Sequence, residues 1–202
     1  MPVFIALWAV GLPLIGWAAW GTASAGTAVL LFMAGVVLWT FTEYALHRFV
    51  FHWQPGAAPL AQLVFIVHGN HHAVPNDRLR NLMPPIVSLP LGGLIWLAML
   101  ALAGPAGSCL FLGFMTGYVG YDLVHYACHQ WPMKGRMARM LKTHHMRHHH
   151  LHETGNFAIT GMMWDRLFRT GLDQSAGVQA SKSAGLRSTG ASGAAARAPS
   201  HP

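Results

Sequence analysis

The chain has 202 residues, enough for one domain, and 53% of them are hydrophobic while only 9% are charged. A usual soluble domain carries roughly 25% charged residues, so this composition argues against a soluble protein and indicates a membrane protein. The net charge of +7 does not indicate nucleic-acid binding, because no basic patch with interleaved aromatic side chains offers a platform on which bases could stack.

Four apolar stretches approach the about 20 residues that cross a bilayer. They are residues 3–20, 27–46, 86–103 and 107–124. The first stretch is not a signal peptide, because it lacks a basic leader and a second apolar stretch follows it. The connectors 21–26 and 104–106 are short, small and uncharged, so they predict tight turns and two hairpins of transmembrane helices. Helices are expected because a backbone in lipid must satisfy its own hydrogen bonds.

Two hairpins place both chain termini on the same side of the membrane, together with a predicted helical cap made of residues 47–85 and 125–173. All thirteen Lys and Arg residues and all fourteen histidines fall on that side. The positive-inside rule assigns it to the cytoplasm. We therefore expect a multi-pass integral membrane protein, in a bacterial inner membrane, with a membrane domain over residues 1–173. Residues 174–202 are rich in Ala, Ser and Gly and are expected to form a disordered tail.

The histidines of the predicted cap fall into four groups. These groups are His47 and His52; His68, His71 and His72; His125 and His129; and His144, His145, His148, His149 and His150. Residues three or four apart share one face of a helix, so the second group, the third group and, within the last group, His145, His148 and His149 each predict one face of metal ligands. His47 and His52 lie roughly 140° apart around an ideal helix. They either serve different metals or flank a break in the helix.

A single histidine group is as well explained by a structural or surface role as by a metal. Four groups at ligand spacing on one side of a membrane favour a metal site. Ten imidazoles exceed the about four to six ligands of one transition-metal ion, so we predict two ions. Glu43 and Asp122 each precede a histidine by about one helical turn, and Glu153 and Asp165 follow the last group. Carboxylates so placed are expected to accept hydrogen bonds from ligating imidazoles and to offset the metal charge.

The motifs "EYALHRFVFH", "HGNHHAVPND", "GYVGYDLVHY" and "LKTHHMRHH" followed by "MMWDRLF" resemble the fatty acid hydroxylase superfamily, which are membrane di-metal oxygenases. The likeness is strongest to its fatty acid 2-hydroxylases and covers about residues 40–170. It implies ten ligands: His47, His52, His68, His71, His72, His125, His129, His145, His148 and His149. Residues expected in contact with ligands are Glu43, Asp122, His144, His152 and Asp165. No catalytic residue beyond the metal centre is assigned.

The resemblance implies an oxidoreductase, a monooxygenase that uses O2 and two iron ions to hydroxylate the acyl chain of a lipid beside its carbonyl. Imidazoles suit zinc as well, so zinc can replace iron in a purified sample. Eukaryotic members of this branch carry an N-terminal cytochrome b5-like domain, whereas this chain starts directly with an apolar stretch. Electrons are therefore expected from a separate redox partner, a cytochrome b5 or ferredoxin type with an NAD(P)H reductase.

Other functions remain open at this point. A carotenoid ring hydroxylase or a sterol or acyl desaturase shares the histidine scheme, and neither spacing nor fold separates them from a fatty acid hydroxylase. A membrane metal transporter belongs to a different class and predicts ligands along a path through the bilayer. Here the histidines gather beyond the ends of the apolar stretches, which favours the enzyme.

Overall fold

The structure is a computed structural model that describes residues 1–172, so the tail predicted for residues 174–202 lies outside the described residues. The regular secondary structure of residues 1–172 is all helical, with no strand, which confirms the all-α prediction. The long helices are α1 (Pro2–Ala19), α2 (Ala25–Leu46), α5 (Pro85–Ala103), α6 (Gly107–Gln130) and α7 (Arg136–His150). The short elements are η1 (His47–Phe51), α3 (Ala58–Val64), η2 (Phe65–Gly69), α4 (Asn70–Ala73), η3 (Gly104–Ala106) and α8 (Met163–Leu167).

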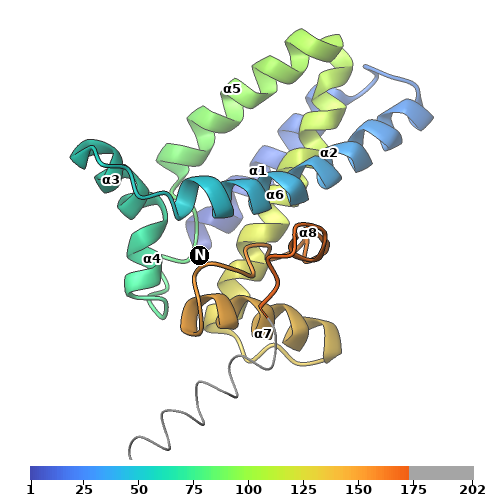
Figure 1. Cartoon of the computed structure of the whole chain (residues 1–202). Helices are drawn as coiled ribbons and strands as arrows, with labels where there is room; N and C mark the ends of the chain where they lie inside the picture. Colours follow the sequence, from blue (N-terminus) through green and yellow to red (C-terminus); the bar gives the residue numbers. More distant parts are fainter. Residues whose placement is uncertain (173–202) are drawn as a thin grey trace, which may run out of the picture.

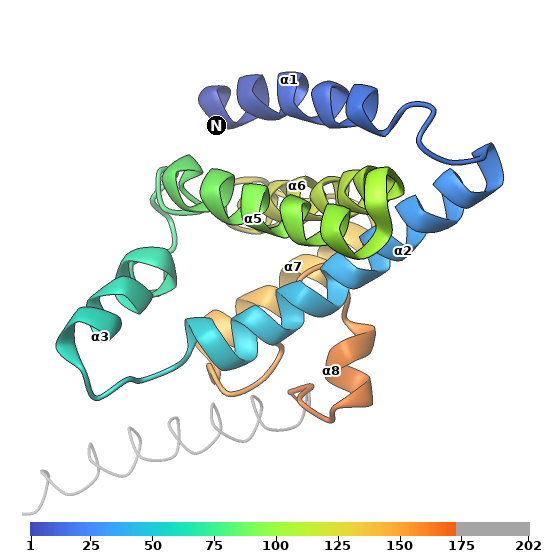
Figure 2. The same cartoon turned by 90° about the horizontal axis from the view of Figure 1, so that it is seen from above.

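Helix α6 is the central element of the fold. It packs against α1, α2 and α5, and Figure 2 shows it enclosed by these helices. Large aromatic side chains fill the contact, and the Trp39 ring lies 5.1 Å from the ring centroids of both Phe114 and Tyr118. Helix α6 also continues six residues beyond the stretch predicted to end at residue 124. His125 and His129 therefore stand on a core helix, which fixes their position.

Glycines allow α2 and α6 to approach closely. A Cβ atom on Gly113 would lie 1.9 Å from the carbonyl oxygen of Phe32, and one on Gly35 would lie 2.1 Å from the carbonyl oxygen of Leu110. Small residues at such contacts let helix backbones meet in membrane proteins. This contact holds the N-terminal half of α2 against α6.

The described residues contain three helical stretches that are long and apolar enough to cross a bilayer: Pro2–Ala19, Ala25–Phe51 and Pro85–Gln130, the last of which includes both α5 and α6. Their outer faces expose large apolar side chains, among them Trp17, Leu30, Leu94 and Leu102. Apolar surface of this extent is unusual on a soluble monomer and is suited to lipid. The fold is that of an integral membrane protein.

The connections within the two helix pairs lie at the same end of the molecule. Figure 1 shows the α1–α2 and α5–α6 connections together, with α3, α4 and α7 gathered at the opposite end near the N-terminus. The fold thus collects at one end the segments that carry the histidines.

Candidate metal centre

The structure brings ten histidines together in two groups of five, and within each group the nearest ring nitrogens lie within 4.8 Å of one another. The first group is His47, His52, His68, His72 and His148. The second group is His71, His125, His129, His145 and His149. These are the ten residues that the sequence indicated as ligands.

The sequence motifs do not map one to one onto the two groups. His68 and His72 belong to the first group, whereas His71 between them belongs to the second. Likewise His148 joins the first group, while His145 and His149 join the second. Spacing left open which group each histidine serves, and the structure divides these two motifs between both groups.

Two π-helical turns shape the first group. In a π-helix the hydrogen bond runs from residue i to i+5, so residues five apart come to share a face. His47 begins η1 and His52 follows its end, and their ring centroids lie 5.1 Å apart. The two histidines serve the same group, which decides between the alternatives left open by their spacing. His68 lies in the second π-turn, η2.

Oxygen acceptors orient four of the imidazole rings through their Nδ1 atoms. His47 faces the carbonyl oxygen of Phe157, and His148 faces that of Gly155 at 2.8 Å. In the second group His125 faces the main-chain oxygen of Asn81 at 3.1 Å, and His71 faces its side-chain oxygen at 3.3 Å. The four contacts thus involve the carbonyls of Phe157 and Gly155 and two oxygens of Asn81. Because a carbonyl oxygen only accepts, Nδ1 carries the hydrogen and Nε2 presents a lone pair.

The donor atoms fit bound metal ions. The Nε2 atoms of His71 and His125 lie 2.9 Å apart although both rings carry their hydrogen on Nδ1, so two lone pairs face each other. A cation held between them would remove this repulsion, and neutral imidazole nitrogens are ordinary ligands of transition-metal ions. The buried Nε2 atoms of His47, His68 and His72 have no hydrogen-bond partner within residues 1–172. Such orphaned acceptors are expected where a metal completes the site.

The surroundings also keep the imidazoles neutral. Burial lowers the pKa of His52 and of His71 to about 4 each. Burial, followed by repulsion from His148 and other neighbouring rings, lowers the pKa of His72 to about 2. Burial is likewise the largest cause that holds the pKa of His68 and of His145 well below 6.5. Neutral imidazole is the form that binds a metal ion.

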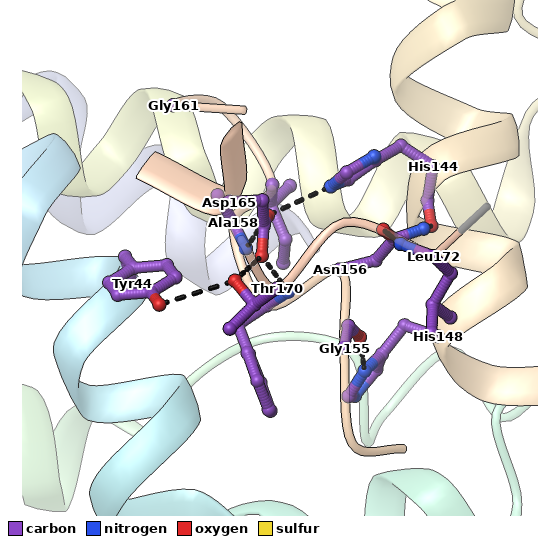
Figure 3. A network of polar contacts seen from close by, with 12 residues as sticks. Tyr44, His144, His148, Gly155, Asn156, Ala158, Gly161, Asp165, Thr170 and Leu172 are labelled. Carbon is purple, nitrogen blue, oxygen red and sulfur yellow. Dashed lines mark hydrogen bonds and ion pairs between the residues drawn. The ribbon is translucent and has the colours of Figure 1, made fainter. Parts of the chain in front are cut away.

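Two buried carboxylates hold the segment that orients the first group. Glu43 accepts hydrogen bonds from the main-chain N–H groups of residues 159, 160 and 161 and from the Thr160 hydroxyl. Asp165 accepts from the N–H groups of residues 157 and 158, from Thr170 and from the His144 ring, as Figure 3 shows in part. Burial opposes ionisation of Asp165, but hydrogen bonds from His144, Thr170 and Ala158 outweigh it and lower its pKa.

These contacts differ from the expected ones. Glu43 and Asp165 were expected to accept directly from ligand imidazoles, but they bind the backbone of residues 157–161, whose neighbouring carbonyls accept instead. Asp122 accepts from the N–H of Met83 at 3.3 Å and so supports the loop that carries Asn81. The carboxylate that does contact a ligand candidate is Glu153, which lies 3.1 Å from Nδ1 of His72.

The two other histidines expected near the ligands, His144 and His152, belong to neither histidine group. His144 bonds to Asp165 at 2.9 Å and faces away from both histidine groups. His152 is exposed, and the structure does not bring it to either group. Asn81 escaped sequence reasoning altogether, since it lies ten residues after His71 in a polar loop where no periodicity or motif marks it.

Two pockets share Phe51 in their linings, and only the outer one is lined by histidines of the first group. An apolar pocket, the inner pocket, lies among α2, α5 and α6, and its lining includes Trp39, Leu91, Gly92, Phe114, Met115 and Tyr121. The outer pocket is lined by His52, His68, His72, Trp53, Phe65 and Glu153, among others. Phe51 lines both pockets and stacks on His68 with ring centroids 4.9 Å apart.

Apolar helices that end in two five-histidine groups define a histidine-rich integral membrane protein with a candidate di-metal centre. Comparison with known families makes the class specific. The model of the fatty acid hydroxylase family matches residues 32–170, which includes all ten histidines. The chain belongs to the fatty acid hydroxylase family.

Individual relatives agree with this assignment. Human fatty acid 2-hydroxylase is 40% identical over 144 residues, which cover 69% of this chain and 39% of the human protein. Dihydroceramide fatty acyl 2-hydroxylase FAH1 of Arabidopsis thaliana is 34% identical over 175 residues, covering 84% of this chain and 74% of the plant protein. A solved structure of scs7p, in which only the hydroxylase domain is visible, is 32% identical with a TM-score of 0.77, covering 85% of this chain and 66% of that one.

The chain thus spans less than half of the length of the human relative.

Proposed function

We propose that this protein is a membrane-bound, O2-dependent fatty acid 2-hydroxylase that acts on the acyl chain of a lipid. The observation that carries the proposal is the pair of five-histidine groups together with an apolar pocket whose lining residue Phe51 stacks on His68. The names of the relatives, fatty acid 2-hydroxylase and dihydroceramide fatty acyl 2-hydroxylase, support the same reaction and lipid class.

The ten histidines would hold two iron ions, one in each group. An unactivated C–H bond offers no handle to an acid, base or nucleophile, so the bound irons would supply oxygen activation with two electrons from an external donor. The protein's own contribution is to keep the imidazoles neutral and oriented, through burial and the carbonyls of Gly155, Phe157 and Asn81. Zinc suits the same nitrogen donors and can replace iron in a purified sample.

The two pockets suggest how the lipid binds. The acyl tail would lie in the inner pocket, against Trp39 and Phe114, and the polar end of the lipid would lie in the outer pocket near Trp53 and Glu153. Phe51 lines both pockets, so the carbons beside the carbonyl would pass Phe51 and His68. In this proposal the carbon next to the carbonyl would lie at the first histidine group. The apolar lining would exclude water and restrict the reacting carbon to one place.

The arrangement in the membrane follows from the same helices. We place four spans, α1, α2, α5 and α6, in the bilayer with the histidine end in the cytoplasm, because the basic residues lie at that end. Electrons would come from a separate acidic carrier of the cytochrome b5 or ferredoxin type. The exposed side chains of Arg136 and Arg139 on α7 present the positive charge that such a carrier would recognise.

The proposal is tested by lipid analysis of cells that express the wild type, His145→Ala or the exposed control His150→Ala. We expect 2-hydroxy acyl lipids with the wild type and with His150→Ala, and their loss with His145→Ala, because His145 is fully buried in the second group. If 2-hydroxy lipids are the same in all cells while carotenoids or double bonds change, the protein is a ring hydroxylase or a desaturase instead. Iron content and O2 consumption with a supplied reductant separate an enzyme from a transporter.

A further inference from the structure

Asn81 contacts two histidines of the second group at once. It lies in the loop between α4 and α5 and is 1% exposed. Its main-chain oxygen faces Nδ1 of His125 at 3.1 Å, and its side-chain oxygen faces Nδ1 of His71 at 3.3 Å. The Nε2 atoms of these two rings in turn lie 2.9 Å apart. One residue therefore orients two donor nitrogens of the second group toward each other.

The side-chain amide of Asn81 is only partly satisfied. Its Nδ2 atom is buried and has no hydrogen-bond partner within residues 1–172. A buried donor left without a partner destabilises the fold. A buried leucine of similar size would have no unpaired donor. The contact of the Asn81 side-chain oxygen with Nδ1 of His71 gives a reason for an amide at this position. The loop is held in place by Asp122, which accepts from the N–H of Met83.

The first group is oriented by different segments. Its acceptors are the carbonyls of Gly155 and Phe157 and the carboxylate of Glu153. These three residues follow α7 in the chain, whereas Asn81 precedes α5. Within residues 1–172, none of the three forms a hydrogen bond with a ring of the second group. The two groups therefore have separate supports.

We propose that Asn81 is a positioning residue for the second histidine group alone, which fixes the tautomer and direction of His71 and His125 and so sets the affinity of that group for its metal ion. The inference rests on the proposed di-metal centre. Hydrogen-bond partners of ligating histidines typically change metal affinity by about 10–100-fold when they are removed. Because the supports are separate, the loss falls on one ion of the two.

The experiment titrates the purified full-length chain, loaded with Zn²⁺, against a chelator and follows zinc release. We expect two ions per wild-type chain. In Asn81→Leu one ion is released at about 10–100-fold lower chelator strength, and the other is released as in the wild type. Asn81→Asp keeps an acceptor oxygen and adds a negative charge beside the second group, so it is expected to hold one ion more tightly and leave the other unchanged.

Double variants assign the weakened ion. His129→Ala removes a nitrogen from the second group and His68→Ala removes one from the first. In the His129→Ala background, Asn81→Leu is expected to weaken the ion of the second group further and to leave the ion of the first group unchanged. In the His68→Ala background, where the second group keeps all five histidines, Asn81→Leu is expected to weaken the ion of that second group. Equal weakening of both ions in Asn81→Leu, or unchanged release of both, overturns the inference.

The folding control is built into the measurement. An intact first ion in Asn81→Leu shows that the chain is folded, and if that variant yields no folded protein, Asn81→Asp decides alone. Unchanged affinity for both ions in Asn81→Asp then overturns the inference. A wild type that holds no pair of ions refutes the proposed di-metal centre itself, which distinguishes the two failures.

Discussion

At the scale of single residues, the polar atoms around the histidines act mainly through the backbone. Glu43 stands on α2 and is 2% exposed, and four donors from residues 159–161 surround its carboxylate. A buried carboxylate requires such compensation. The bonds tie α2, which is followed directly by His47 at the start of η1, to the segment whose Phe157 carbonyl orients that histidine.

Replacing Glu43 tests this connection. Glu43→Gln keeps the shape but turns an –NH2 group toward donors that need an acceptor, so it is expected to lower the free energy of unfolding by about 1–3 kcal/mol. Thermal unfolding of the purified chain in detergent measures the change. Asp77→Asn is the matched control, since Asp77 pairs with Arg80 at the surface and its loss is expected to leave stability unchanged. Equal stability of wild type and Glu43→Gln would contradict the proposed tie.

Sequence spacing identified the histidines and the nearby acids but not how they interact. A helical repeat indicates which residues share a face, so it could pick out the ligand candidates. It carries no information on partners such as Glu43 and Thr160, which are 117 positions apart. Nor could it show that η1 would be a π-turn, because the change from i+4 to i+5 bonding depends on packing around His47 and His52. Asn81 was missed for the same reason, since its role is set by tertiary contacts.

At the scale of secondary structure, close contact between α2 and α6 sets where the histidines stand. The hairpins were predictable from two apolar stretches joined by a short connector. The glycine contact was not, because the sequence of α6 also contains glycines with no such role. Gly113 faces the backbone of Phe32, whereas Gly120 on the same helix has no atom within 4 Å of an added Cβ.

The two glycines give a paired test. Gly113→Ala places a Cβ where the Phe32 oxygen lies and is expected to destabilise the fold by about 1–3 kcal/mol. Gly120→Ala meets open space and is expected to be neutral or to stabilise by about 0.5–1 kcal/mol, the helix preference of Ala over Gly. Thermal unfolding of both variants compares them directly. A similar change in both would show that helix propensity, not close packing, governs these positions.

Helix α5 contributes Leu91 and Gly92 to the inner pocket, which is the proposed site of the acyl tail. Gly92 lines this pocket, and an added Cβ would lie 3.9 Å from the Met115 sulfur. Gly92→Leu is expected to fill the pocket and shift the 2-hydroxy products toward shorter acyl chains, with the total yield less affected. Gly93→Leu is the control, because a Cβ there meets nothing within 4 Å. Mass spectrometry of the product lipids measures the distribution, and identical chain lengths in both variants would place the acyl tail elsewhere.

At the scale of the whole molecule, the histidines join segments that otherwise have little contact. Helix α3 buries no residue, and α3, η2 and α4 pack chiefly on one another. What links them to the rest of the fold includes His68 and His72 in the first group and His71 in the second. Metal ions bound there would connect η2 and α4 to α6 and α7, in the way that metal binding often contributes to folding free energy.

Metal removal should therefore loosen one part of the molecule before the rest. Chelation is expected to free residues 53–84 while α1, α2, α5 and α6 keep their packing, because those helices bury their own apolar contacts. Arg78 and Arg80 lie in the freed segment and are the chain's only Lys or Arg between residues 49 and 133. Limited trypsin digestion should thus cut faster at these two sites after chelation.

The connector between α6 and α7 provides the internal comparison for that experiment. Lys134 is exposed in this connector, four residues after the end of the core helix α6. Because α6 is expected to keep its packing after chelation, the cleavage rate at Lys134 should change less than the rate at Arg78 and Arg80. Restoring the metal should slow cleavage at Arg78 and Arg80 again, since reformation of both groups requires η2 and α4 to return. If chelation accelerates all sites equally, the metal supports the whole fold. If it accelerates none, packing alone holds residues 53–84 in place.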